Sequence, residues 1–251
     1  MKLRTSLYAL CLAVGASFAI ATPAAAETVR FATEGNLAPF EYVDANGELQ
    51  GFDVDIAHAL CEQMQVTCEV VAQDWDGLIP GLKVHKFDAI IASMSITPER
   101  QRVVDFTQRY YSNVLAFVAP KADTLDRDNL KDKVIGAQRA TISAQILEDD
   151  YADQGVEVKL YDTQDNAYID LANGRLDALL TDKYPAYDWL KAPQGQAFEF
   201  KGDDIDINDR IGIAVRQGDP LRERLNQAIQ DIIDNGTYAK INAKYFPFSI
   251  Y

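Results

Sequence analysis

Hydrophobic residues follow two alternating patterns along the chain. Short apolar runs of about five residues, typical of buried strands, alternate with stretches whose apolar positions recur every three or four residues, as on one face of a helix. The expected strands cover residues 29–33, 68–72, 88–92, 114–118, 133–137, 156–161, 177–181 and 211–215, and the expected helices cover 54–65, 77–86, 165–172 and 220–234. Strands that alternate with helices predict parallel sheets covered by helices, an α/β fold.

The last predicted helix has clear start and stop signals. Asp219 suits its N-cap, and Pro220 suits the first helical position, where a missing N–H costs nothing. Gly236 suits the C-terminal end because glycine tolerates a left-handed backbone.

The first 26 residues have the pattern of an export signal. Lys2 and Arg4 give a basic start, residues 7–21 are apolar, and the small residues 24–26 precede Glu27. We therefore expect a signal peptide over residues 1–26, cleaved after Ala26, and a periplasmic location. No later apolar run approaches the roughly 18 residues of a membrane span, so no direct membrane insertion is expected.

The charge balance excludes some partners. The 251 residues include 38 acidic and 24 basic side chains, a formal net charge of −14. Nucleic-acid binding needs a basic face, so no nucleic-acid partner is expected. Most of the acidic side chains are expected on the solvated surface, where they favour solubility and attract cations over long range.

Two of the three cysteines remain after export. Cys11 leaves with the signal, whereas Cys61 and Cys68 stay in a compartment that favours disulfides. A metal site is the alternative, but two cysteines with His58 nearby would be an unusual ligand set. We expect a disulfide, which would stabilise the fold by a few kcal/mol at most because its loop is short.

Catalytic and cofactor motifs are absent from the sequence. It has no nucleotide-binding glycine loop, no nucleophile elbow and no zinc-protease motif. His58 and His85 are the only histidines, which disfavours a serine or cysteine nucleophile with a histidine base. The abundant carboxylates leave a general acid open, but none has a partner motif. We expect no cofactor, no metal and no enzymatic activity.

Five short segments carry most of the remaining information. They are TEGNLAPF at 33–40, GFDVD at 51–55, DWDGLIP at 74–80, ASMSITPER at 92–100 and GRLDALLTD at 174–182. In this order and spacing they resemble the periplasmic solute-binding proteins of polar amino-acid ABC importers. The subfamily most similar is that of the lysine/arginine/ornithine- and histidine-binding proteins. The resemblance extends over residues 28–251.

This resemblance implies an α/β fold of two lobes, the type II periplasmic binding protein fold. Lobe 1 would comprise residues 27–111 and 210–251, and lobe 2 would comprise residues 112–209, with two crossing strands between them. An amino acid would bind in the cleft between the lobes, which close over it. The implied partner is the membrane permease of an ABC importer, and the protein is expected to be a monomer.

The family pattern also implies which residues grip the α-carboxylate of the ligand. Arg100 matches the carboxylate-binding arginine, and a guanidinium fork bonds both carboxylate oxygens. An ion pair with a neighbouring acid such as Glu99 is the alternative. Ser93 and Ser95 follow a strand end, where α/β sheets place ligands. Thr141 precedes a helix in lobe 2, where its hydroxyl and N–H would face the carboxylate from the other side, in addition to capping that helix.

Carboxylates and one aromatic residue are implied for the cationic groups. Asp182 matches the family position for the α-ammonium, although a solvated aspartate is the plainer alternative. Glu34 matches an acid that faces the distal cation of basic ligands, and Asp53 is a second acid near that region. Trp75 matches an aromatic residue that packs on the ligand side chain, and a guanidinium on an indole is favourable. The expected ligand is a cationic L-amino acid, with arginine ahead of lysine, ornithine and histidine.

Three positions depart from the subfamily pattern. Leu37 stands where tyrosine is frequent, and Arg139 and Ala140 stand where small residues, glycine and then serine, are usual. Arg139 could pair with Glu34 or Asp53, or recognise a second carboxylate on the ligand, which keeps opine-like ligands open.

Two other classes share this scaffold. Periplasmic dehydratases that act on prephenate or arogenate are one, but an intact Arg100 and Asp182 favour a grip on a zwitterion, and no catalytic set is evident. Sensory domains are the other, but these are usually fused to a transmembrane segment and a signalling module, which this sequence lacks.

Overall fold

The computed structural model describes residues 27–251, so the expected signal peptide lies outside the described residues. Its strands are β1 (Thr28–Thr33), β2 (Asn36–Leu37), β3 (Glu41–Val43), β4 (Leu49–Gln50), β5 (Thr67–Ala72), β6 (Ala89–Ile90), β7 (Asp105–Pro120), β8 (Val134–Gln138), β9 (Glu157–Tyr161), β10 (Ala178–Asp182) and β11 (Phe198–Val215). Its α-helices are α1 (Phe52–Met64), α2 (Leu78–Lys83), α3 (Pro98–Gln101), α4 (Ile142–Ile146), α5 (Gln164–Ala172), α6 (Lys183–Lys191), α7 (Leu221–Asp234) and α8 (Thr237–Tyr245).

The strands form two sheets, and the larger one spans the molecule. Its order is β5-β1-β6-β11-β7-β10-β8-β9, whereas β2, β3 and β4 form a small separate sheet. Strands β1, β5 and β6 are mutually parallel, as are β8, β9 and β10, while β7 and β11 run antiparallel to each other. The parallel groups joined through helices confirm the predicted α/β class.

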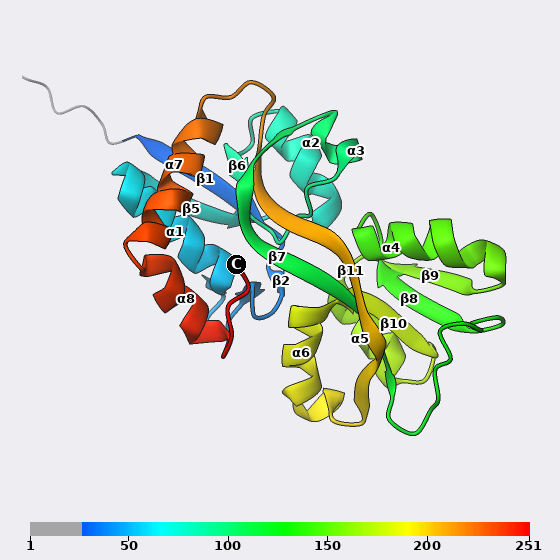
Figure 1. Ribbon diagram of the computed structural model, residues 1–251. Helices are drawn as coiled ribbons and strands as arrows, with labels where there is room; N and C mark the ends of the chain where they lie inside the picture. The colour runs from blue at the N-terminus through cyan, green and yellow to red at the C-terminus, as the bar shows by residue number, and fades with distance from the viewer. Residues whose placement is uncertain (1–26) are drawn as a thin grey trace, which may run out of the picture.

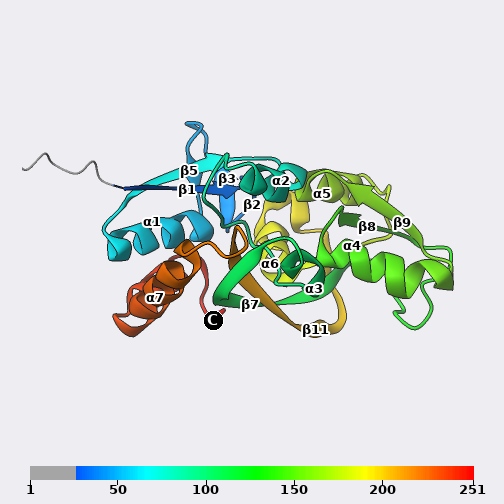
Figure 2. The same ribbon diagram turned by 90° about the horizontal axis from the view of Figure 1, so that it is seen from above.

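Strands β7 and β11 carry the chain between two bodies (Figure 1). One body holds β1, β5 and β6 with α1, α7 and α8, and the other holds β8, β9 and β10 with α4, α5 and α6 (Figures 1 and 2). Each crossing strand is far longer than the sequence predicted, with 16 residues in β7 and 18 in β11. Only their continuously buried parts, residues 115–119 and 211–215, have the apolar pattern of a core strand.

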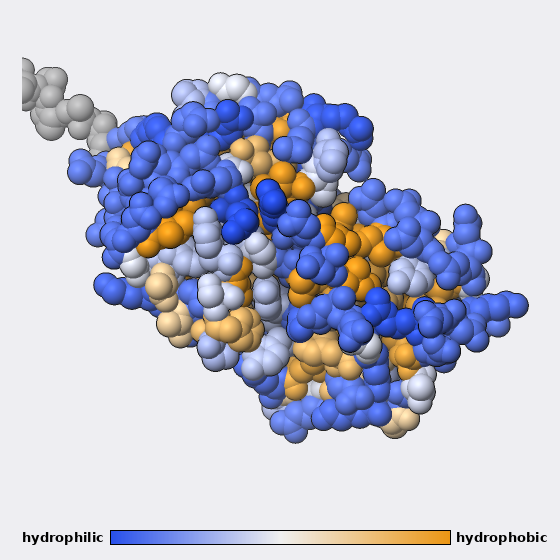
Figure 3. All heavy atoms as spheres, viewed as in Figure 1, coloured by the Kyte–Doolittle hydropathy of each residue, from blue (hydrophilic) through white to orange (hydrophobic). Residues whose placement is uncertain are grey.

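Each body has its own buried core. In the first, Phe40 packs against Tyr111 with 4.9 Å between ring centres, and Phe52 and Phe246 extend the same aromatic cluster. In the second, Phe117 and its neighbours pack under α4, and a separate cluster lies under α5. The removal of these apolar side chains from water is the main contribution to the stability of each body. On the face shown in Figure 3 the rim is mostly hydrophilic, and hydrophobic residues gather nearer the middle.

Some predicted element bounds were wrong. The helix expected over 77–86 is a 3₁₀ turn over Trp75–Gly77 followed by the short α2. Helix α7 begins at Leu221, one residue later than expected, yet Asp219 still accepts a hydrogen bond from the Leu221 N–H at 3.0 Å. The small sheet was missed because strands of two or three residues have too few positions to show an alternating pattern.

The predicted disulfide is present. Cys61 in α1 and Cys68 in β5 are bonded, with 5.6 Å between their Cα atoms. Among residues 27–251 no cluster of three or more histidine, cysteine or acidic side chains is arranged to hold a metal ion. In the same range, no helix combines the length and apolarity that crossing a membrane requires.

Candidate ligand-binding site

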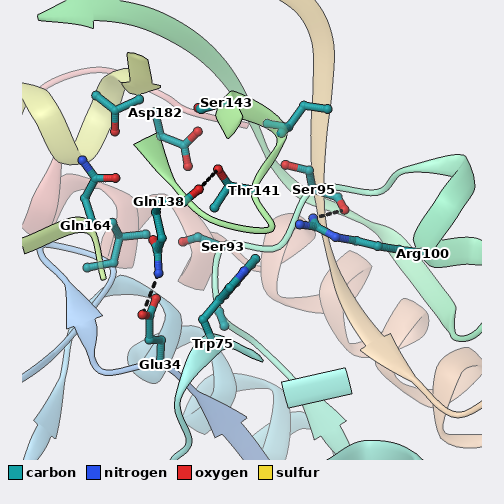
Figure 4. Close-up of a pocket in the computed structure, with 14 residues that line it drawn as sticks. Glu34, Trp75, Ser93, Ser95, Arg100, Gln138, Thr141, Ser143, Gln164 and Asp182 are labelled. Carbon is teal, nitrogen blue, oxygen red and sulfur yellow. Dashed lines mark hydrogen bonds between the residues drawn. The ribbon is translucent and has the colours of Figure 1, made fainter. Parts of the chain in front are cut away.

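A small cavity of about 30 Å³ lies between the two bodies. Seven of the eight predicted ligand residues line it, and Asp53 does not. Figure 4 shows Arg100, Asp182 and Glu34 at three separate edges of this space, with Trp75 between Glu34 and Arg100. The complete lining comprises Glu34, Leu37, Trp75, Ala92, Ser93, Ser95, Arg100, Gln138, Thr141, Ile142, Ser143, Gln164, Thr181 and Asp182.

Arg100 is placed by the short helix α3. The Thr97 hydroxyl accepts the Arg100 N–H at 3.2 Å, and Pro98 occupies the first turn, so this helix start is well capped. The guanidinium donates to the carbonyl of Ser95 at 2.8 Å and to the carbonyl of Ala140, in the other body, at 2.9 Å. It also lies 5.3 Å from the ring centre of Trp75.

The charge of Arg100 has no carboxylate partner in the described part of the chain. Among residues 27–251 it forms no ion pair, so the alternative of a pair with a neighbouring acid such as Glu99 is wrong. Burial lowers the pKa of this guanidinium, although Asp209 and Asp182 offset part of that effect. A half-buried cation held only by carbonyl groups is a binding site for an anion.

Asp182 is the matching negative charge on the other body. It ends β10 and receives a 2.8 Å hydrogen bond from the Asn113 side chain, but within the described chain no cation pairs with it. Burial, together with the nearby Asp209, raises the pKa of Asp182 to about 7, although Asn113 and Arg100 act to lower it. A cation that enters the cavity would stabilise the ionised form of this buried carboxyl group.

Glu34 is a second buried acid on the cavity wall. Its exposed fraction is 5%, and burial raises its pKa to about 7. Gln138, at the end of β8, donates to Glu34 at 2.8 Å across the gap between the bodies (Figure 4). The Trp75 indole N–H likewise reaches the Ala140 carbonyl at 3.3 Å. These contacts join the two bodies directly over the cavity.

The predicted hydroxyl residues line the cavity, but the hydroxyls of all three, Ser93, Ser95 and Thr141, are already engaged. The Ser95 hydroxyl donates to Asp209 at 3.2 Å. The Thr141 hydroxyl donates to the Gln138 carbonyl at 2.7 Å and accepts an N–H of α4, so it caps that helix. These residues therefore have backbone groups rather than free hydroxyls to offer a ligand.

Asp53 lies behind the cavity wall, contrary to expectation. It is fully buried and accepts the Ser93 N–H at 2.7 Å, the Ser93 hydroxyl at 3.2 Å and the Tyr110 hydroxyl at 2.9 Å. With these three bonds its carboxylate is directed into the protein, so it supports Ser93 instead of facing a ligand.

Arg139 also lies elsewhere than the sequence suggested. It pairs with Asp76 of the other body and with Asp162, and its side chain is 45% exposed. The suggested pairing with Glu34 or Asp53 is therefore wrong, and Arg139 is not part of the cavity lining.

Two glutamines on the wall were missed by the sequence reading. Gln138 ends β8 and Gln164 begins α5 directly after β9, so the rule that ligands meet the carboxyl ends of strands points to both. Gln164 is only 5% exposed, and its side-chain nitrogen has no hydrogen-bond partner in the described chain. An unpaired buried amide on a cavity wall is a candidate contact for a ligand.

Comparison with known proteins agrees with this architecture. The chain is 41% identical to the L-arginine-binding protein of Pseudomonas aeruginosa over 100% of this chain and 99% of that one. It is 39% identical to the lysine/arginine/ornithine-binding periplasmic protein of Escherichia coli over 99% of both chains. These relatives are named as binding proteins, not enzymes.

A solved structure has the same fold. An ancestral arginine-binding protein bound to arginine superposes with a TM-score of 0.83 at 37% identity, over 87% of this chain and 98% of that one. This likeness confirms the expected type II periplasmic binding protein fold. Residues 29–248 match the family model of the bacterial extracellular solute-binding proteins, family 3. The chain belongs to that family.

Proposed function

We propose that this protein is the extracytoplasmic substrate-binding component of an ABC importer and binds a cationic L-amino acid. Arginine is favoured, with lysine, ornithine and histidine as further ligands. One observation carries the proposal. Arg100 and Asp182 have opposite charges, come from different bodies, lack an ion-pair partner in residues 27–251 and line the same cavity.

The two charges match the two ends of a zwitterion. Arg100 uses two of its five N–H donors on Ser95 and Ala140, so others remain for a carboxylate. Asp182 accepts one bond from Asn113 and has remaining oxygen lone pairs for an ammonium. Charge-assisted bonds of this kind are among the strongest that a site can make.

The rest of the lining selects the side chain of the ligand. Glu34 adds a second negative charge that a neutral or acidic side chain would leave unpaired. Trp75 offers an indole face, on which a guanidinium stacks favourably. Gln138 and Gln164 add amide groups that meet a ligand rich in N–H donors. The names of the Pseudomonas aeruginosa and Escherichia coli relatives support the same ligand class.

The expected lobe boundaries fit the distribution of the buried cores. We place lobe 1 at residues 27–111 and 210–251 and lobe 2 at residues 112–209. The buried clusters of the first body draw on residues up to Tyr111 and from Ile211 onward, and those of the second begin at Leu115. A ligand that bonds to both lobes shifts the equilibrium toward the closed form.

Export and partners follow from the same assignment. Residues 1–26 would be removed after Ala26, and the mature protein would reside in the periplasm as a monomer that delivers its ligand to a membrane permease. The name of the Escherichia coli relative, a periplasmic protein, supports this placement. The opine alternative loses its main support because Arg139 lies outside the cavity lining.

A thermal-shift screen tests the proposal. A ligand at about 100 times its Kd stabilises a protein by about 2.7 kcal/mol. We expect arginine to raise the Tm, with smaller shifts for lysine, ornithine and histidine. Citrulline, a neutral near-isostere of arginine, is the matched control for the distal charge. The absence of a response to any cationic amino acid, or equal shifts with citrulline and arginine, would contradict the proposal.

A further inference from the structure

Two fully buried acids lie together behind Ser93. Glu41 is in β3 and Asp53 is in the first turn of α1, and the exposed fraction of each is 0%. The Ser93 hydroxyl lies 3.2 Å from an oxygen of Asp53 and 3.5 Å from an oxygen of Glu41, so both carboxyl groups meet the same hydroxyl, and each acts on the pKa of the other. Within residues 27–251 neither forms an ion pair. Two adjacent carboxylates without a cation do not both ionise, so the pair retains a proton.

The hydrogen bonds show which acid keeps that proton. Asp53 accepts three bonds, from the N–H and the hydroxyl of Ser93 and from the Tyr110 hydroxyl, and the start of α1 favours a negative charge at its position. Glu41 accepts only the long contact from Ser93 on one oxygen, and no described residue donates to its other oxygen. The anion therefore belongs on Asp53 and the proton on Glu41.

The surroundings of the pair reinforce this assignment. Burial and the Asp53 charge raise the pKa of Glu41 well above its ordinary value, and Glu34 acts in the same direction. The other titratable groups whose charges act with the pair are phenols or acids rather than bases, namely Tyr110, Tyr111, Tyr238 and Glu34.

Ser93 is the link between this pair and the ligand cavity. It lines the cavity, and its φ of 51° is in the left-handed region, which is unfavourable for a serine. Asp53 binds both the N–H and the hydroxyl of Ser93 and so compensates for this conformation. If the pair lost its shared proton, two negative charges would lie side by side, and their repulsion would disturb the hydrogen bonds between Asp53 and Ser93.

We propose that Glu41 is a positioning residue: it keeps its proton and donates a hydrogen bond to Asp53, so that the Asp53 anion fixes Ser93 in the conformation that lines the binding cavity. The ligand side of this inference rests on the proposed function. The protonation of the buried Glu41 at neutral pH does not depend on any ligand and can be tested without one.

Infrared spectroscopy tests the retained proton directly. The protein is labelled with ¹³C on its glutamate carboxyl groups and measured near pH 7.5, where a surface glutamate of ordinary pKa is ionised. All variants carry Glu34→Gln, because the raised pKa of Glu34, about 7, would otherwise leave part of that side chain protonated as well. In this background we expect a labelled carboxylic-acid C=O band that Glu41→Gln removes and that Glu48→Gln, at an exposed glutamate, leaves unchanged. A spectrum of the Glu34→Gln protein without such a band, or a band that persists when Glu41→Gln is added, would overturn the proposal.

Arginine titrations of two variants test the positioning role. Glutamine at position 41 keeps a neutral hydrogen-bond donor toward Asp53. Leucine has a similar size but no donor. We expect Glu41→Gln to bind within about twofold of wild type and Glu41→Leu to bind about tenfold or more weakly. Equal losses in both variants would overturn the positioning role. If wild type bound no arginine, the proposed function would fail while the infrared result would still decide the proton.

Discussion

Replacing Arg100 with alanine should weaken arginine binding severely and agmatine binding only slightly. Agmatine is arginine without its α-carboxylate, so it lacks the group that Arg100 is proposed to hold. Each terminal nitrogen of the guanidinium already spends one hydrogen, on the carbonyl of Ser95 at 2.8 Å and of Ala140 at 2.9 Å. One hydrogen on each nitrogen remains, which suits a two-point contact with a carboxylate.

The expected loss follows from those two bonds. Charge-assisted hydrogen bonds contribute about 1.5–3 kcal/mol each, so Arg100→Ala should cost arginine about 3–6 kcal/mol, roughly a 10²- to 10⁴-fold rise in Kd. Arg100 also bonds to the opposite body through Ala140, so its loss will disturb closure. That second effect acts on both ligands alike, and the ratio of the arginine change to the agmatine change cancels it.

Isothermal titration calorimetry of wild type and Arg100→Ala with both ligands gives this ratio. Arg102→Ala is the matched control, because Arg102 follows the same short helix but is exposed and lies outside the cavity lining. If arginine and agmatine lost affinity by the same factor, Arg100 would act on closure alone and the carboxylate assignment would be refuted.

Three further predictions concern acidity, selectivity and stability. The pKa of Asp182, about 7, is raised above its value in the unfolded chain, so its contribution to ligand-free stability falls as pH rises from about 4 to 7, while arginine affinity rises as the carboxylate forms. The Tm of Asp182→Asn minus the Tm of wild type should therefore increase as pH rises across this range. A difference that stays constant with pH would contradict the assignment. Gln164→Leu should raise the Kd for arginine about tenfold or more and that for lysine less, because the side-chain oxygen of Gln164 is an acceptor and a guanidinium offers it more donors than an ammonium does; competition titrations with both ligands check this, and equal losses would exclude selectivity at this position. A Cys61→Ser/Cys68→Ser double variant should lose about 2 kcal/mol of unfolding free energy, as expected for a loop closed across a separation of 7 residues, with arginine affinity unchanged; urea denaturation and titration check both, and weakened binding would contradict a purely structural role.

The charged ends of the site were predicted from the family resemblance, and local structure holds both in place. Arg100 belongs to a capped turn, Thr97-Pro98-Glu99-Arg100, and Asp182 ends a buried strand, so each position is set by residues close to it in the chain. Both residues line the cavity.

Contacts between distant segments were not predictable in this way. Gln138 meets Glu34 across 104 positions of sequence, and only the folded chain brings them together. Asp53 was misplaced because a carboxylate in a first helical turn faces either solvent or protein, and the partner that decides, Ser93, lies 40 positions away. Glu41 gave no signal because its short strand shows no periodic pattern.

The structure of the arginine complex tests the central claim most directly. We predict that the α-carboxylate lies on the Arg100 guanidinium and the α-ammonium on Asp182, with the guanidinium of the ligand between Trp75 and Glu34. An arginine bound in the reverse orientation, or outside the cavity between the two bodies, would contradict the account.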